Sequence, residues 1–161
     1  MGRFKIPAHI ESLKPYPPGK PIRELERELG LTGVIKLASN ENPFGPSPLA
    51  VAAIKKTLAD LNRYPDGSGY YLKKRLSRQI GQPAERIVLG CGANEILDLT
   101  CRVLVGPGGR AVLPHPSFLV YQKFLQATGA EAVLVPLAGL AIDLTAMSRA
   151  VDEEVRLVIV C

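Results

Sequence analysis

The apolar positions divide the chain into a proline-rich beginning and a regular second half. From Arg86 onward, continuous apolar runs alternate with segments in which apolar residues recur every three or four positions. The runs predict strands and the periodic segments predict helices. The predicted strands are residues 86–90, 110–114, 130–137 and 155–160, and the predicted helices are residues 93–104, 117–129 and 144–151. This alternation is typical of an α/β fold with a mostly parallel sheet that is flanked by helices on both faces.

The beginning of the chain has a different character. Residues 1–20 are rich in proline and weakly periodic, which predicts an extended arm rather than a packed element. A short helix is expected at 21–30, with Pro21 in its first turn and Gly30 at its C-terminal cap. A short strand is expected at 34–39.

Two loops and two helices are predicted between these elements and the regular half. The segments NENPFGPSP and NRYPDGSG are interrupted by proline and glycine, which favours loops. Ser47 is expected to cap the first helix, with Pro48 in its first position. The apolar stripe that this helix is expected to bury comprises Leu49, Ala53, Ile54, Leu58 and Leu61. The second helix carries Leu72, Leu76 and Ile80 on one face.

Composition and charge exclude several classes of function. The 161 residues can form one domain with a core, and the net charge is +5. The positive residues occur in scattered groups such as Lys55–Lys56, without a nucleic-acid-binding motif, so no nucleic-acid partner is expected. No apolar run is long enough to span a membrane, and the first residues lack the apolar segment of a signal peptide. The three cysteines show no CxxC spacing, so we expect a cytoplasmic protein without disulfides or a metal site.

The junction GCGAN, residues 90–94, points to phosphate binding. It lies between a predicted strand and a predicted helix. The first turn of a helix has unpaired N–H groups and a partial positive charge, and glycines let an anion approach the backbone closely. The pattern is shorter than a dinucleotide fingerprint and lacks the Gly-Lys-Ser/Thr of a P-loop. Taken alone, it is equally consistent with a tight structural turn.

Four segments that follow one another along the chain favour phosphate binding over a purely structural turn. They are SNENPFGPSP (39–48), NRYPDGSGYYLKKRL (62–76), IVLGCGANEIL (87–97) and VLPHPSFLVYQ (112–122). The set resembles the pyridoxal-phosphate (PLP) aminotransferases of fold type I, and among them the histidinol-phosphate aminotransferase branch. The resemblance runs from Tyr16 to Cys161. It implies PLP as cofactor, a small-molecule amino-acid or phosphate-ester substrate and a homodimer.

The resemblance also implies which residues bind the cofactor. In this family the segment that matches GANE holds the cofactor phosphate, which assigns that role to Gly92, Ala93 and Asn94. An aromatic residue after the next strand stacks on the pyridine ring. The family often has tyrosine there, and Phe118 keeps the stacking face without the hydroxyl. Tyr64 is implied to reach the cofactor phosphate of the other subunit.

The substrate pocket is implied to be lined by Tyr16, Asn40 and Asn42. Simpler roles stay open for several of the implied residues. Phe118 is also consistent with a core position, because Tyr121 and Phe124 follow it at helical spacing. Tyr64 is also consistent with a loop anchor. Both asparagines are also consistent with turn formation, which is common for asparagine.

No catalytic residue is assigned from the sequence. PLP transamination requires a lysine that forms the Schiff base, and no lysine here lies in a context that matches it. In the family that lysine lies later in the sequence. We therefore expect the chain to be the N-terminal part of an aminotransferase. On this interpretation, residues 1–30 are an arm and short helix, and residues 31–161 are a partial PLP-binding large domain that stops before the catalytic lysine.

The resemblance implies that the parent enzyme converts histidinol phosphate and 2-oxoglutarate to imidazole-acetol phosphate and glutamate, in histidine biosynthesis. A related PLP-dependent decarboxylase of an amino-acid phosphate would use the same phosphate cradle. The missing lysine leaves a second class open, a non-catalytic fragment or phosphate-binding remnant. A self-standing nucleotide-binding domain is disfavoured, because the third glycine of the dinucleotide fingerprint is absent.

Overall fold

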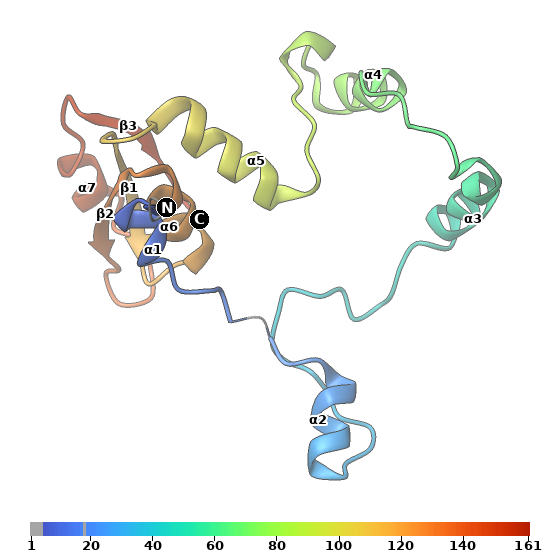
Figure 1. Cartoon of the computed structure of the whole chain (residues 1–161). Helices are drawn as coiled ribbons and strands as arrows, with labels where there is room; N and C mark the ends of the chain where they lie inside the picture. Colours follow the sequence, from blue (N-terminus) through green and yellow to red (C-terminus); the bar gives the residue numbers. More distant parts are fainter. Residues whose placement is uncertain (1–4, 18) are drawn as a thin grey trace. The chain divides into compact units, whose positions relative to one another are not determined.

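The computed structural model describes residues 5–17 and 19–161 (Figure 1). The chain forms two compact units, one made of Met1–Tyr16 with Gln82–Cys161 and the other of Pro17–Gly81.

The first unit is built on a three-stranded parallel sheet. Its strands are β1 (Arg110–His115), β2 (Glu131–Pro136) and β3 (Val155–Val158). The strand order is β2-β1-β3, and β1 pairs in parallel with both neighbours, with Arg110 opposite Glu131 and Val155. Three of the four predicted strands of the second half, and their parallel arrangement, are therefore confirmed.

The prediction of a strand at residues 86–90 is wrong. The 3₁₀ turn η2 (Ala84–Arg86) stands at its beginning, and the residues after it form no strand. Ile87 has extended backbone angles and a buried side chain. An apolar run becomes a strand only when another strand offers hydrogen-bonding partners, and no described segment pairs with this one.

Helices cover both faces of the sheet, as predicted. They are α5 (Ala93–Thr100), the π-helical turn η3 (Cys101–Val105), α6 (Leu119–Thr128) and α7 (Leu144–Arg149). Successive residues of β1 point to opposite faces. Ala111 and Leu113 pack in one buried cluster with residues of η3 and α6, while Val112 packs in a second cluster with Met147 of α7. β1 is thus the centre of the core.

The connection between η3 and β1 depends on a glycine. The Gly106 N–H donates to the Cys101 carbonyl oxygen over 3.0 Å and closes the π-helical turn. A Cβ atom on Gly109 would lie 2.3 Å from the Val105 carbonyl oxygen, so only glycine fits at this position. The turn GPGG, residues 106–109, therefore brings the backbone of the helix end against the start of β1.

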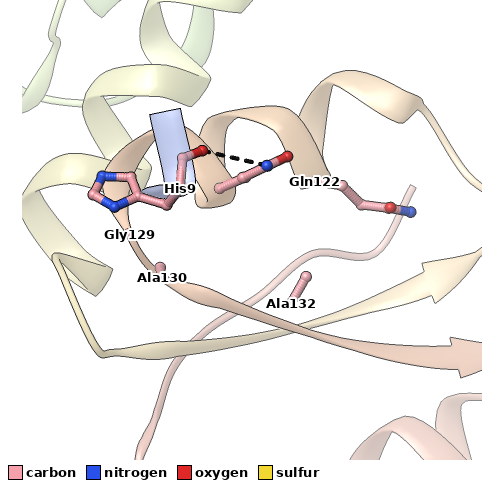
Figure 2. A pocket seen from close by; sticks show the side chains of 6 residues that line it. His9, Gln122, Gly129, Ala130 and Ala132 are labelled. Carbon is pink, nitrogen blue, oxygen red and sulfur yellow. Dashed lines mark hydrogen bonds between the residues drawn. The ribbon is translucent and has the colours of Figure 1, made fainter. Parts of the chain in front are cut away.

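The predicted arm contains a short helix, so the expectation of an unpacked extended segment is wrong. Helix α1 (Ala8–Glu11) contacts α6. The Gln126 side-chain amide donates to the His9 carbonyl oxygen over 3.3 Å, the contact drawn as a dashed line in Figure 2, and to the Ser12 hydroxyl over 3.0 Å. The Lys123 ammonium donates to the Lys14 carbonyl oxygen. These contacts are polar, so apolar periodicity does not reveal them.

A cavity of about 330 Å³ lies beside this contact. Figure 2 shows the residues that line it, which are His9, Gln122, Gln126, Gly129, Ala130 and Ala132. None of the residues implied to bind cofactor or substrate lines this cavity.

The second unit consists of helices and connecting loops. Its elements are α2 (Ile22–Leu29), α3 (Pro48–Thr57), the 3₁₀ turn η1 (Leu58–Asp60) and α4 (Tyr70–Ile80). Gly30 ends α2 in a left-handed conformation, as predicted. Pro21 precedes α2 at the N-cap instead of lying in its first turn. Ser47 occupies the N-cap position of α3 but makes no side-chain capping bond.

Two predictions for this unit are wrong. Residues 34–39 form no strand, because no described segment pairs with them. The apolar stripe of α3 and η1 is exposed, with Leu49 at 84% and Leu61 at 72%. Apolar spacing identifies the helix face that requires cover, but it does not show whether a nearby element supplies the cover. Among the residues that the structure describes, no helix has the length and apolar character needed to cross a membrane.

Arg110 connects all three strands at their amino ends, which leads to a prediction for stability. Its guanidinium lies 3.4 Å from Glu131 of β2. It also lies 3.7 Å from Glu154 and bonds Asp152, and these two residues stand one and three positions before β3. We expect Arg110→Met to lower the free energy of unfolding by about 1 kcal/mol, because ion pairs at partly exposed positions contribute little each. The measurement is urea unfolding followed by circular dichroism, with Arg149→Met as the control.

The difference between Arg110→Met and the unsubstituted chain is expected to shrink as salt is added, because salt screens exposed charges. An equal loss of stability in Arg110→Met and Arg149→Met would contradict a special role for Arg110.

Candidate functional site

The carboxyl ends of parallel strands lie together at one edge of a sheet, where ligands commonly bind in α/β folds. Phe118 follows β1 and occupies the N-cap position of α6. Cys161 lies three residues beyond the end of β3. The hydroxyl of Tyr121, on α6, donates to the Cys161 sulfur over 3.0 Å. The structure thus brings residues from the ends of β1 and β3 together.

The turn before α5 has the geometry expected of an anion site. Gly92 is the N-cap residue, with φ 83° and ψ 178°, a conformation that favours glycine. Its N–H donates to the Gly90 carbonyl oxygen over 2.8 Å. Among the described residues, no group accepts a hydrogen bond from the N–H groups of Ala93, Asn94 or Glu95. Three donors therefore remain available at the positive end of the helix.

The two glycines of this turn serve different purposes. A Cβ atom on Gly90 would lie 2.9 Å from the Ile96 side chain and 3.0 Å from the Glu95 carboxylate, so Gly90 allows the turn to pack against α5. A Cβ on Gly92 would meet no atom within 4 Å. Only Gly92 therefore leaves open space beside the free donors.

Glu95 completes the turn, and sequence reasoning missed its role. Its carboxylate accepts a hydrogen bond from the Cys91 N–H. A side chain that reaches back from the first helical turn to a preceding N–H is a known form of N-terminal capping. The spacing of Glu95 from the glycine pair was the available signal for this role. The contact stabilises the turn. It occupies the Cys91 N–H and leaves the N–H groups of Ala93 and Asn94 available.

Phe118 is not a core residue. Its side chain is 39% exposed, whereas Tyr121 is 9% exposed and belongs to the apolar cluster beneath the sheet. The Phe118 ring meets two tyrosine rings nearly at right angles, Tyr16 at 6.3 Å and Tyr121 at 5.5 Å between ring centres. The structure therefore brings together two of the residues implied by sequence, Tyr16 and Phe118. It adds Tyr121, for which the sequence predicted no role at the site.

The bond to Cys161 affects the titration of Tyr121. Donation of the hydroxyl proton to the Cys161 sulfur raises the pKa of Tyr121 above its ordinary value, and burial raises the pKa further. The Cys161 thiolate charge acts in the same direction. The raised pKa extends toward higher pH the range in which Tyr121 is a neutral hydrogen-bond donor.

Three of the implied residues belong to the unit of residues 17–81. Asn42 forms a turn, because its side chain accepts from the Phe44 N–H over 3.0 Å and donates to the Gly45 carbonyl oxygen over 3.1 Å. Asn40 is exposed. Tyr64 is fully exposed, so it does not anchor its loop. The roles of these residues beside a cofactor or substrate stay predictions.

Asp66 organises the loop RYPDGSG, which sequence reasoning described only as a loop. Its carboxylate accepts from the Ser68 N–H over 2.9 Å, from the Ser68 hydroxyl over 2.7 Å and from the Tyr70 N–H over 3.1 Å. The Ser68 hydroxyl is the main cause of a lowered pKa at Asp66, followed by the two N–H groups. Asp66 thus joins the loop that carries Tyr64 to the start of α4.

Comparison with known proteins gives a consistent result. Residues 32–161 match the family model for aminotransferase class I and II. Histidinol-phosphate aminotransferase of Desulfotalea psychrophila is 46% identical over 158 residues, which are 98% of this chain and 42% of that protein. Histidinol-phosphate aminotransferase 1 of Nitrosococcus oceani is 47% identical over 151 residues, 94% of this chain and 41% of that protein.

A solved structure also matches. The histidinol-phosphate aminotransferase from Sinorhizobium meliloti, in complex with pyridoxal-5'-phosphate, has a TM-score of 0.82 and 29% sequence identity. The match covers 98% of this chain and 42% of that chain. These similarities confirm the expected aminotransferase fold. The chain spans about two fifths of the length of the relatives it matches.

The three cysteines are free and differ in exposure, which predicts their reactivity. Cys101 is buried, and burial followed by the nearby Asp98 charge raises the pKa of its thiol. We expect Cys101 to react with a thiol reagent at least tenfold more slowly than Cys91 and Cys161, because the thiolate is the reactive form. Mass spectrometry of the labelled peptides measures each rate, and labelling in denaturant is the control. Equal rates in the folded chain would contradict the burial of Cys101.

Proposed function

Because the chain belongs to the class I and II aminotransferase family, we propose that its protein is a PLP-dependent histidinol-phosphate aminotransferase. The proposed reaction converts histidinol phosphate and 2-oxoglutarate to imidazole-acetol phosphate and glutamate, in histidine biosynthesis. The observation that carries this proposal is the 46–47% identity to histidinol-phosphate aminotransferases along nearly the whole chain.

The turn before α5 fits the phosphate of PLP. A phosphate group requires several hydrogen-bond donors, and backbone N–H groups at a helix start provide them together with a favourable dipole. The N–H groups of Ala93, Asn94 and Glu95 are free of partners among the described residues, and the space beside Gly92 is open. The Asn94 side chain adds a further donor. These features support Gly92, Ala93 and Asn94 as phosphate-binding residues.

Phe118 fits the pyridine ring of PLP. Its ring is partly exposed and is held beside two other aromatic rings. When bound, PLP supplies an electron sink for the carbon that loses its proton in the reaction. Phe118 would hold the plane of the cofactor ring by stacking, and as phenylalanine it offers no hydrogen bond to the cofactor.

The remaining roles follow from the family resemblance. Tyr16, Asn40 and Asn42 would line the substrate pocket, and Tyr64 would reach the cofactor phosphate of a second copy in a homodimer. No lysine of the 161 residues is assigned to proton transfer. The proposal therefore assigns cofactor and substrate binding to this chain and leaves the proton-transferring group unassigned.

Enzyme assay of the purified protein tests the proposed reaction. With PLP, histidinol phosphate and 2-oxoglutarate, we expect formation of glutamate, and we expect none when 2-oxoglutarate is omitted. Release of carbon dioxide from an amino-acid phosphate, without glutamate, would replace the proposal with the related decarboxylase reaction. A protein that binds no PLP would contradict both enzymatic functions.

The phosphate site has its own test in the 161-residue chain. Gly92→Ala places a side chain where φ is 83°, which strains the turn by about 1–3 kcal/mol. We expect the affinity for inorganic phosphate to fall roughly tenfold, because the free N–H groups lose their arrangement. Isothermal titration calorimetry measures the affinity.

Gly139→Ala is the matched control for this substitution. Gly139 also has a positive φ, 65°, and also has open space around its Cβ position, but it lies between β2 and α7. We expect this variant to bind inorganic phosphate like the unsubstituted chain. Similar losses in both variants would show that the turn before α5 is not the phosphate site.

A further inference from the structure

Tyr121 stands between the hydrophobic core and the ring that is proposed to stack on PLP. We propose that Tyr121 is a positioning residue, which fixes the orientation of Phe118 and thereby the plane of the bound cofactor ring. This inference rests on the proposed function, because it assumes that Phe118 contacts the cofactor. It adds a residue that never touches the cofactor itself.

The first support is the contrast in burial between the two rings. Phe118 is 39% exposed and stands at the start of α6, so its own packing leaves its ring freedom to turn. Tyr121 is 9% exposed and packs with Cys101, Leu113 and Leu125. The two rings meet at 88°, with centres 5.5 Å apart, in the edge-to-face geometry that aromatic pairs favour. The buried ring of Tyr121 thus restrains the partly exposed ring of Phe118.

The second support is the hydroxyl of Tyr121. A buried tyrosine usually has a hydrogen-bond partner for its hydroxyl, and here the partner is the Cys161 sulfur at 3.0 Å. Tyr121 belongs to α6, which follows β1, whereas Cys161 lies beyond β3. The bond therefore connects α6 to the segment that follows a different strand.

Tyr16 provides a second perpendicular contact to Phe118, at 6.3 Å and 77°. It is 46% exposed and comes from the segment that follows α1. Because Tyr16 is half-exposed and Tyr121 is buried, Tyr121 is the more rigid of the two neighbours. An aligned cofactor ring matters for rate, since small errors in orientation at the reacting centre are costly.

The experiment compares two probes on the 161-residue chain. Inorganic phosphate reports the phosphate site alone. Pyridoxine 5'-phosphate reports the phosphate site together with the pyridine ring, and it lacks the aldehyde that reacts with a lysine. Calorimetry gives both affinities, and the induced circular dichroism of the bound pyridine ring reports its orientation.

The variants separate the ring of Tyr121 from its hydroxyl. We expect Tyr121→Leu to weaken pyridoxine 5'-phosphate binding roughly three- to tenfold, to reduce its induced circular dichroism, and to leave inorganic phosphate binding unchanged. Tyr121→Phe keeps the ring and is expected to restore most of the affinity. Phe118→Ala is expected to remove the whole advantage of pyridoxine 5'-phosphate over inorganic phosphate.

Two results would overturn the positioning role without touching the proposed function. One is an unchanged affinity and circular dichroism in Tyr121→Leu, while Phe118→Ala loses affinity. The other is an equal loss for both probes in Tyr121→Leu, which would mark a merely structural residue. Absence of binding of either probe to the unsubstituted chain would instead overturn the phosphate and pyridine sites that are assigned to this chain, and this inference with them, while the enzyme assay tests the proposed function separately.

A pH titration tests the link to Cys161 separately. The folded pKa of Tyr121 is raised, so the stability that the bond adds is complete below the ordinary tyrosine pKa and is lost as pH rises through the folded pKa. The titration of Tyr121 is obtained as the difference in ultraviolet absorbance between the unsubstituted chain and Tyr121→Phe. We expect Cys161→Ala to shift this Tyr121 transition to lower pH. An unchanged Tyr121 transition in Cys161→Ala would overturn the proposed anchor.

Discussion

The parallel pairing of β1 with a strand on each side determines where the other parts of this unit lie. β1 contributes Ala111, Val112 and Leu113, all fully buried, to the clusters on both faces of the sheet. Because both pairs are parallel, the strands end at the same edge. Ligands of α/β folds commonly bind at the connections that leave that edge. The pairing of β1 with β3 places Phe118, which follows β1, and Cys161, which follows β3, at the same edge of the sheet.

The site consists of two local features of this unit, and the first of them follows from the arrangement of the sheet. At the end of β1, the chain turns into α6, which places Phe118 at the surface and Tyr121 one turn further in the core. Before α5, a glycine in a positive-φ conformation starts a helix whose first N–H groups have no described partners. One part of the unit offers an aromatic surface and another offers anion-binding donors. A phosphorylated aromatic cofactor requires both kinds of contact.

Sequence reasoning succeeded where a residue pattern depends on its own neighbours. The strands β1, β2 and β3 were predicted because their apolar runs are continuous, and Gly30 ends a helix as its position indicated. It failed where the structure of a segment depends on contacts with a distant part of the chain. The apolar segments at 34–39 and 86–90 are not strands, because no described segment forms the backbone hydrogen bonds of a sheet with them. Helix α1 was missed, since polar contacts from Gln126 and Lys123 hold it.

At the candidate site, too, local patterns were predicted and contacts between distant residues were not. The glycine junction was recognised because its residue types and order are informative by themselves. The bond from Tyr121 to Cys161 joins residues that are 40 positions apart, and no local pattern predicts such a bond. Phe118 and Tyr121 are three positions apart, but their spacing alone does not show that the two rings pack at right angles. The role of Glu95 at the Cys91 N–H was missed although the spacing permits it, because an acidic residue in a first helical turn is ordinary.

The central claim is that the N–H groups at the start of α5 bind the phosphate of the cofactor. The most direct test is nuclear magnetic resonance of the ¹⁵N-labelled chain during titration with inorganic phosphate. The account predicts that the largest amide shifts occur at Ala93, Asn94 and Glu95. Shifts confined to other parts of the chain, or none at saturating phosphate, would contradict it.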